Sequence, residues 1–123
     1  LNFSKTLDIE LMNQATTDML DHDDFKCFSK SRTDVKTYLC DIQEAYWEQN
    51  GSDLVFFIQA NRFLRNMVRA IVGTLIEVGL KKISIDDFKS ILLSRDRSKA
   101  GYSVPAHGLY LEKVYYSKHI FAV

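Results

Sequence analysis

The sequence predicts an α+β domain in which two to three helices pack on one face of a mainly antiparallel sheet. Three observations lead to this fold class. The dipeptide Asn50-Gly51, a strong hairpin signal, separates two runs in which apolar residues alternate. Residues 62–78 carry apolar side chains at helical spacing. The elements follow one another as helix, strands, two helices and strand, so the 123 residues are expected to form a single domain.

The first half of the chain is expected to hold one helix and the strand pair. Residues 7–20 have apolar side chains every three or four positions, as an amphipathic helix does. These side chains are Leu11, Met12, Ala15 and Met19. A short strand at 25–28 and a polar loop at 29–34 come next. The strand pair is expected at 36–48 and 53–60, where apolar residues recur with a period of two.

The second half is expected to hold two helices and a last strand. The long helix at 62–78 is followed by a second helix that begins at Ser84. The Ser84 hydroxyl and the Asp87 carboxylate have the spacing of a capping box. Residues 94–108 contain Gly and Pro among polar side chains, which is typical of an irregular loop. Residues 109–116 are rich in Leu, Val and Tyr and are expected to form the final strand.

The composition excludes several classes of protein. The chain is 46% hydrophobic and 26% charged, and no run of 18 apolar residues could form a transmembrane helix. Two cysteines are too few for a disulfide scaffold, and their spacing does not match a zinc site. Cys27 and Cys40 are therefore expected to be reduced and half-buried in a cytosolic protein. The chain begins at Leu1 without signal-peptide features, which indicates a cut inside a longer protein.

The net charge of zero conceals an uneven distribution of charge. Residues 1–60 hold five Lys or Arg against eleven Asp or Glu, whereas residues 61–100 hold nine against four. A local excess of positive charge of this size is what a phosphate-binding surface requires. The second half of the chain is therefore the place to look for a nucleic-acid contact.

The long helix carries the most informative polar residues. At about 100° per residue, five positions fall on the face opposite the apolar stripe. They are Arg62, Arg65, Asn66, Arg69 and Gly73. Arginines on one face suit phosphate or carboxylate, although a solvated helix face explains the same charges. Arg69 is singled out because Gly73, one turn later, leaves room for another backbone to approach the guanidinium.

The loop that follows contributes a second basic group. Arg95, Arg97 and Lys99 alternate with polar residues there and would suit contacts to a nucleic-acid backbone. The adjacent aromatic residues Phe56 and Phe57 invite comparison with base-stacking modules, but the motif of those modules is absent, so core packing is expected.

Four ordered motifs resemble the C-terminal half of the bacterial tRNA pseudouridine synthase A family. The first is the run FLRNMVRAIVGTL at 63–75. The others are FSK at 28–30 with TDVKT at 33–37, DRSKAG at 96–101 and PAHGLYL at 105–111. Their order and spacing agree over residues 7–116, which makes the resemblance specific.

The resemblance implies an enzyme that isomerises uridine to pseudouridine in the anticodon arm of tRNA. It implies no cofactor and no metal, a cytoplasmic location without membrane attachment, and a homodimer. The nucleophilic aspartate of the family lies in a Gly-Arg-Thr-Asp-Ala-Gly-Val-His-Ala motif of the N-terminal half, which this chain lacks. Arg69 matches the arginine that pairs with this aspartate, and Leu109 matches the leucine that packs against the target uracil. Arg62, Arg65, Asn66, Arg95, Arg97 and Lys99 are then expected to bind RNA.

The triplet Arg32-Thr33-Asp34 repeats part of the catalytic motif but lacks its flanking residues. Asp34 matches a different segment of the family and is not expected to be the nucleophile, so this chain alone is expected to be inactive. Two alternatives stay open. The chain could be a non-catalytic RNA-binding domain with the same helix and loop, or a dimerisation module.

Overall fold

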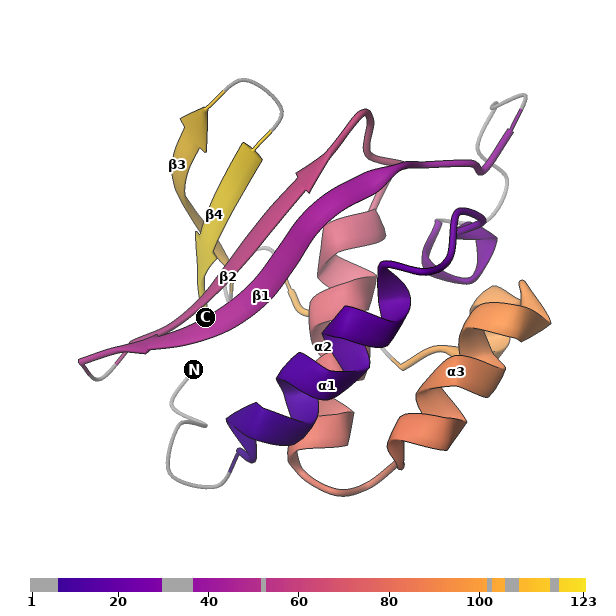
Figure 1. Ribbon diagram of the computed structural model, residues 1–123, viewed down its shortest axis with the longest axis horizontal. Coiled ribbons are helices and arrows are strands. Elements are labelled where there is room, and N and C mark those ends of the chain that lie inside the picture. Colours follow the sequence, from indigo (N-terminus) through magenta and orange to yellow (C-terminus); the bar gives the residue numbers. More distant parts are fainter. Residues whose placement is uncertain (1–6, 30–36, 52, 102, 106–108, 116–117) are drawn as a thin grey trace.

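Four antiparallel strands form one sheet in the computed structural model, and three helices pack beside it (Figure 1). The structure describes residues 7–29, 37–51, 53–101, 103–105, 109–115 and 118–123. The strands are β1 (Ile42–Asn50), β2 (Asp53–Ala60), β3 (Tyr110–Tyr115) and β4 (Lys118–Ala122), in the spatial order β1-β2-β4-β3. The helices are α1 (Ile9–Met19), α2 (Met67–Gly79) and α3 (Ile85–Ser94). The predicted α+β class is confirmed.

The hairpin of β1 and β2 forms where Asn50-Gly51 predicts it. Gly51 has a φ of 66°, which glycine adopts without a steric penalty. The first strand starts at Ile42, later than the predicted 36, because the chain before it pairs elsewhere. Cys40 N donates to the Asp23 carbonyl at 2.8 Å, and this contact holds residue 40 away from β2.

The alternation of side chains along the hairpin separates two faces of the sheet. Trp47 and Phe56 are partners on the face that packs against the helices, with ring centroids 4.7 Å apart. Tyr46 and Phe57 are partners on the opposite face, with centroids 4.6 Å apart, and both are half-buried. Core packing is thus confirmed for Phe56, whereas Phe57 lies outside the core.

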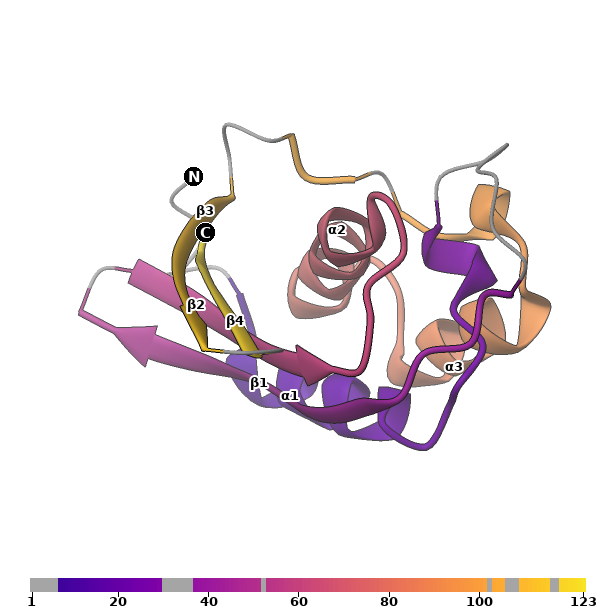
Figure 2. The ribbon, with the colours of Figure 1, turned by 90° about the horizontal axis from the view of Figure 1, so that it is seen from above.

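The helices pack together and against the sheet. Figure 2 shows α2 in the bend of the curved sheet, and α1 contacts β1, α2 and α3. Asn13 ties α1 to β1, because its side chain accepts from Trp47 N at 2.7 Å and donates to the Trp47 carbonyl at 3.1 Å. None of the helices in the described ranges is long and apolar enough to cross a lipid bilayer.

The starts of two helices can be compared with their predictions. Ser84 and Asp87 form both hydrogen bonds of the capping box at α3, as predicted. The long helix differs from its prediction because α2 begins at Met67 rather than at 62. Asn66 adopts a left-handed conformation with φ 68°, which breaks the helical repeat directly before α2. The predicted helical face from Arg62 to Gly73 is therefore wrong for its first three members.

The ends of the sequence-predicted strands also need correction. Residues 25–28 do not form a strand, since Lys26–Phe28 is a short 3-10 helix, η1. The Asp24 carboxylate accepts Lys26 N at 3.0 Å, which closes a turn there. The final strand is β3, but it is followed by β4, which the sequence did not predict. A second 3-10 helix, η2 (Arg97–Lys99), interrupts the predicted irregular loop.

The two cysteines lie deeper in the protein than predicted. Both thiols are free, as expected, but Cys27 and Cys40 are 0% and 2% exposed rather than half-buried. Burial raises the pKa of the Cys27 thiol to about 12, and it also raises the pKa of the Cys40 thiol. Both side chains belong to the hydrophobic core that α1, α2 and the sheet share.

Candidate active site

Arg69 lies on α2 where a second stretch of chain crosses the helix. The main chain of Val104 donates to the Arg69 carbonyl at 3.0 Å, and Arg69 Nε donates to the Val104 carbonyl at 2.8 Å. Arg69 is half-buried and Val104 is buried. The two residues are 35 positions apart, so α2 and the later loop are joined at this point. Another backbone does approach Arg69, as the sequence predicted.

The same stretch is attached to α2 a second time, at Thr74. Gly101 N donates to Thr74 Oγ1 at 3.0 Å, and Thr74 Oγ1 donates to the Ala70 carbonyl at 2.8 Å. A side chain at Gly101 would meet the Glu77 carboxylate, because an added Cβ would lie 3.0 Å from its atoms. Gly101, Ser103 and Val104 are called the covering segment below. The part of α2 around Arg69 and Thr74 therefore lies beneath this segment, so a fully solvated helix face, the alternative explanation of its charges, does not apply there.

The covering segment brings together two more of the predicted site residues. Asn66 Nδ2 donates to Ser103 Oγ at 2.6 Å, and Arg97 Nη2 donates to the same oxygen at 2.9 Å. Arg97 Nη1 also donates to the Gly101 carbonyl at 3.1 Å. Asn66, Arg69 and Arg97 are therefore gathered around the covering segment rather than spread along one helix face.

The Arg69 guanidinium keeps its outer edge for another acceptor. Within the described residues, its one side-chain hydrogen bond is the one from Nε to Val104. A hollow of about 200 Å³ lies beside it, lined by Leu64, Asn66, Met67, Val68 and Arg69. The two Nη groups of an arginine form a planar fork that fits a carboxylate with two parallel hydrogen bonds. Arg69 is thus oriented from one side and can bind a carboxylate from the other.

Leu109 comes directly before β3 and is 9% exposed. It packs with the main hydrophobic core, whereas the next residues, Tyr110 and Leu111, are exposed. The contact of Leu109 with a uracil ring stays a prediction, and in the structure its side chain serves the core.

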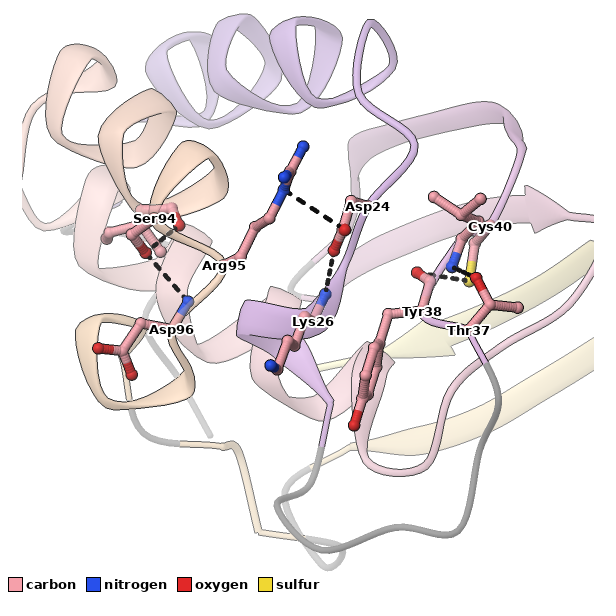
Figure 3. A network of polar contacts seen from close by, with 10 residues as sticks. Asp24, Lys26, Thr37, Tyr38, Cys40, Ser94, Arg95 and Asp96 are labelled. Carbon is pink, nitrogen blue, oxygen red and sulfur yellow. Dashed lines mark hydrogen bonds and ion pairs between the residues drawn. The ribbon is translucent and has the colours of Figure 1, made fainter.

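Two of the predicted RNA-binding arginines have their partners in the first half of the chain rather than in the covering segment. Arg62 Nη1 donates to the carbonyls of Thr37 and Leu39 at 3.1 and 3.3 Å. Arg95, which ends α3 in a left-handed conformation, places Nε 3.4 Å from an oxygen of Asp24 (Figure 3). Figure 3 also shows Lys26, whose N–H donates to the other Asp24 oxygen. Asp34 lies outside the described residues.

Arg65 and Lys99 are exposed, as Arg95 is, but they differ from Arg95 in that no carboxylate is paired with them in the part of the chain that the structure describes. Lys99 belongs to η2, whose start is capped by Asp96. Hydrogen bonds from the hydroxyl and N–H of Ser98 lower the pKa of the Asp96 carboxyl, so this cap is ionised at neutral pH. Within the described ranges, Arg65 and Lys99 make no side-chain hydrogen bond or ion pair.

Sequence reasoning missed Thr74 and Ser103. Both hydroxyls act through partners that are distant in the sequence, since Thr74 is 27 residues from Gly101 and Ser103 is 37 residues from Asn66. The available signal for Thr74 was its position inside the resembling run 63–75, whereas Ser103 lies between the motifs 96–101 and 105–111 and had no motif signal of its own. No described group of three or more His, Cys, Asp or Glu side chains is arranged to hold a metal ion.

Comparison with known proteins gives the family of the chain. Residues 19–117 match the family described as tRNA pseudouridine synthase. The chain is 54% identical over 117 residues to tRNA pseudouridine synthase A of Parabacteroides distasonis, covering 95% of this chain and 46% of that protein. It is 55% identical over 120 residues to the Porphyromonas gingivalis protein of the same name, covering 95% and 47%.

A more distant relative gives the same result. The tRNA pseudouridine synthase A of Bacillus subtilis is 40% identical over 115 residues, which are 94% of this chain and 47% of that protein. The chain spans about half the length of the curated relatives it matches. The matched region includes α2 with Arg69, the covering segment and Leu109. This chain belongs to the tRNA pseudouridine synthase family.

Proposed function

We propose that this chain is the C-terminal part of an enzyme that isomerises uridine to pseudouridine in the anticodon arm of tRNA. The N-terminal half of the same protein would supply the nucleophilic aspartate, since the chain covers less than half of its relatives. The observation that carries the proposal is the geometry of Arg69. Its Nε is held by the Val104 carbonyl, and its terminal nitrogens can receive a carboxylate that arrives from another domain.

The reaction assigns Arg69 two tasks. The bond between N1 of uracil and C1′ of the sugar breaks, the uracil turns, and a bond between C5 and the same C1′ forms. C5 gives up its proton and N1 takes one up, so the composition of the nucleoside is unchanged. This isomerisation needs an ionised carboxylate aimed at the sugar or the base. A fixed guanidinium lowers the pKa of a neighbouring carboxyl and so keeps it ionised, while the planar fork sets its direction. Arg69 would therefore hold the nucleophile ready without touching the RNA.

Recognition of the target requires two further surfaces. A base that has left the RNA stack needs an apolar contact to replace its lost neighbours, and Leu109 is the residue we assign to that contact. The RNA backbone requires cations, which the exposed residues Arg65 and Lys99 are best placed to supply. Arg62, Arg95 and Arg97 are engaged with carbonyls or a carboxylate of this chain, which favours a supporting role.

The two alternative functions explain less of the structure. A non-catalytic RNA-binding domain needs cations on its surface, but it does not need a half-buried arginine fixed from one side by a buried residue. A dimerisation module needs neither feature. Assembly into a cytoplasmic homodimer is part of the proposal for the full-length protein.

The experiment is a pseudouridine assay on unmodified tRNA transcript with the full-length protein and with this chain alone. The full-length protein should convert uridines of the anticodon arm without added metal or cofactor, and this chain should convert none. An inactive full-length protein would refute the proposed function. Conversion by this chain alone that is lost on Asp34→Asn would place the nucleophile here and refute the division between two halves.

A further inference from the structure

The hydroxyl of Ser103 is the meeting point of two side chains from different elements. Asn66 Nδ2 and Arg97 Nη2 both donate to Ser103 Oγ, at 2.6 and 2.9 Å. Asn66 is the residue before α2, and Arg97 is the first residue of η2. Asn66, Arg97 and Ser103 are called the Ser103 clamp below. The clamp joins the start of α2 to the covering segment.

The clamp fixes the shape of the covering segment. The two Nη groups of Arg97 reach the Gly101 carbonyl at 3.1 Å and the Ser103 hydroxyl at 2.9 Å. A guanidinium is planar and rigid, so its two acceptors are held at a set distance from each other. Val104 directly follows Ser103, and its carbonyl receives Arg69 Nε. The position of the Val104 carbonyl, which orients Arg69, thus depends on Gly101 and Ser103, which Arg97 holds.

Asn66 is placed to make this contact at a conformational cost. Its φ of 68° lies in the left-handed region, which asparagine tolerates better than most residues do. An asparagine before a helix ordinarily accepts a hydrogen bond from an N–H of the first turn. The Asn66 side chain makes no such cap and donates to Ser103 instead. The local conformation therefore serves the contact with the covering segment rather than the helix end.

We propose that the Ser103 clamp positions Arg69 for the reaction, so that Asn66 and Arg97 are positioning residues rather than contacts to RNA phosphate. The proposal rests on the proposed function, and it replaces the RNA-binding role that the sequence suggested for these two residues. The order of action is a chain of contacts. The clamp holds the covering segment, its Val104 carbonyl holds Arg69 Nε, and Nε sets the plane in which the guanidinium meets the carboxylate.

The test removes the shared acceptor in the full-length protein. Ser103→Ala takes away the oxygen that both donors use, whereas Ser103→Thr retains a hydroxyl at the same place. The single-turnover rate of pseudouridine formation should fall about 10- to 100-fold in Ser103→Ala, because small displacements of a catalytic group have effects of this size. The affinity for tRNA and its dependence on salt should stay as in the wild type. Ser103→Thr should recover most of the rate.

A matched control separates positioning from a general loss of stability. Ser84→Ala removes the capping hydroxyl of α3, which lies outside the clamp and should weaken the fold without slowing the reaction. Arg97→Gln extends the test to the second member of the clamp. It should lower the rate and leave the slope of binding against salt unchanged, whereas a phosphate contact would flatten that slope.

Each outcome gives a decision. An unchanged rate in Ser103→Ala, or a flattened salt slope in Arg97→Gln, overturns the clamp. If Ser103→Ala does not fold, Asn66→Ala removes one donor and leaves both Arg97 contacts, and an unchanged rate for that variant overturns it equally. If the wild type is inactive, the proposed function fails, and hydrogen exchange decides the clamp by itself. The amides of Gly101 and Val104 should then exchange faster than in the wild type in Ser103→Ala, or in Asn66→Ala if Ser103→Ala does not fold. Unchanged protection of these amides overturns the clamp.

Discussion

Arg69 and Val104 exchange two hydrogen bonds, one from each direction, across 35 positions of sequence. The Val104 N–H binds the main chain of Arg69, and the Val104 carbonyl binds its side chain. One residue of the covering segment thus fixes both the backbone and the guanidinium of the arginine. Such an arrangement orients a charged group before its partner arrives, which is what a catalytic carboxylate requires from its counter-ion.

The contact between Thr74 and Gly101 predicts a measurable stability effect. In Thr74→Val, the buried Gly101 N–H loses its acceptor, and a buried donor without a partner costs about 1–3 kcal/mol. The free energy of unfolding of the full-length protein in urea should fall by that amount. Thr74→Ser retains the hydroxyl and should lose less.

Thr16→Val is the matched control for this prediction. Thr16 is also a buried helical threonine, and its hydroxyl donates to the Met12 carbonyl at 2.7 Å, but among the described residues no second group donates to this hydroxyl. The carbonyl keeps its place in the helix after the substitution, so we expect a much smaller change in the free energy of unfolding. Equal losses in Thr74→Val and Thr16→Val would contradict the anchoring of the covering segment by Thr74.

The salt dependence of tRNA binding should change when an exposed cation is substituted, but not when an arginine bound within the chain is substituted. Arg65→Gln and Lys99→Gln in the full-length protein should weaken tRNA binding. Each should lower the slope of log affinity against log salt by about 0.7–0.9 if one phosphate contact is lost. Arg62→Gln is the control and should leave the slope unchanged, because Arg62 Nη1 donates to the carbonyls of Thr37 and Leu39 in the wild type. An unaltered slope in both Arg65→Gln and Lys99→Gln would mean that these residues are solvated and do not contact RNA phosphate.

The cysteines should be unreactive in the folded protein. Burial raises the pKa of Cys27 from 9.0 to about 12, so its reactive thiolate is scarce at pH 8. The pKa of Cys40 is raised for the same reason. Iodoacetamide followed by peptide mapping should leave both residues unmodified in the native state and label both in guanidinium. Native labelling of Cys27 at the rate of an unfolded peptide would mean that the core opens readily.

The sign of the pH effect on stability follows from the same shift. The folded state favours the protonated Cys27 thiol, since the folded pKa lies above the unfolded value. Its contribution to stability is complete below about pH 9, and it is lost as the pH rises through that value toward 12. When the pH is raised from 8 toward 12, the free energy of unfolding of a Cys27→Ala variant should therefore fall less than that of the wild type.

Local signals in the sequence predicted the elements that local interactions determine. Strand β2 has the predicted bounds because its alternation and the Asn50-Gly51 turn act over a few residues. The capping box of α3 is equally local. Strand β4 escaped prediction because the sequence between Tyr115 and Lys118 contains no Gly, Pro, Asn or Asp, so a second hairpin was not indicated there.

The site depended on contacts that are distant in the sequence. Residues 62–66 have the spacing of a helix, yet Asn66 leaves the helical conformation and binds Ser103, which is 37 positions away. No pattern within the helix indicates that partner. The same holds for Arg97, which has the composition of a surface loop but binds the covering segment. The resemblance identified Arg69, and tertiary structure was needed to find what holds it.

The most direct test of the account is Arg69→Lys in the full-length protein. Lysine keeps the positive charge but lacks the planar fork, so it cannot combine a fixed donor to Val104 with two parallel hydrogen bonds to a carboxylate. We expect a loss of about 100-fold in the single-turnover rate with saturating enzyme, because orientation of the carboxylate is lost. The affinity for tRNA and the melting temperature should stay close to those of the wild type.

The decisive measurement is that single-turnover rate, made beside tRNA binding and thermal melting of both proteins. A large loss of rate with normal folding and binding is the predicted result, and it would establish Arg69 as the group that aims the nucleophile. A rate near that of the wild type would contradict the account and leave Arg69 as a further phosphate contact. A collapse of the melting temperature would contradict it as well, since Arg69 would then be a structural residue.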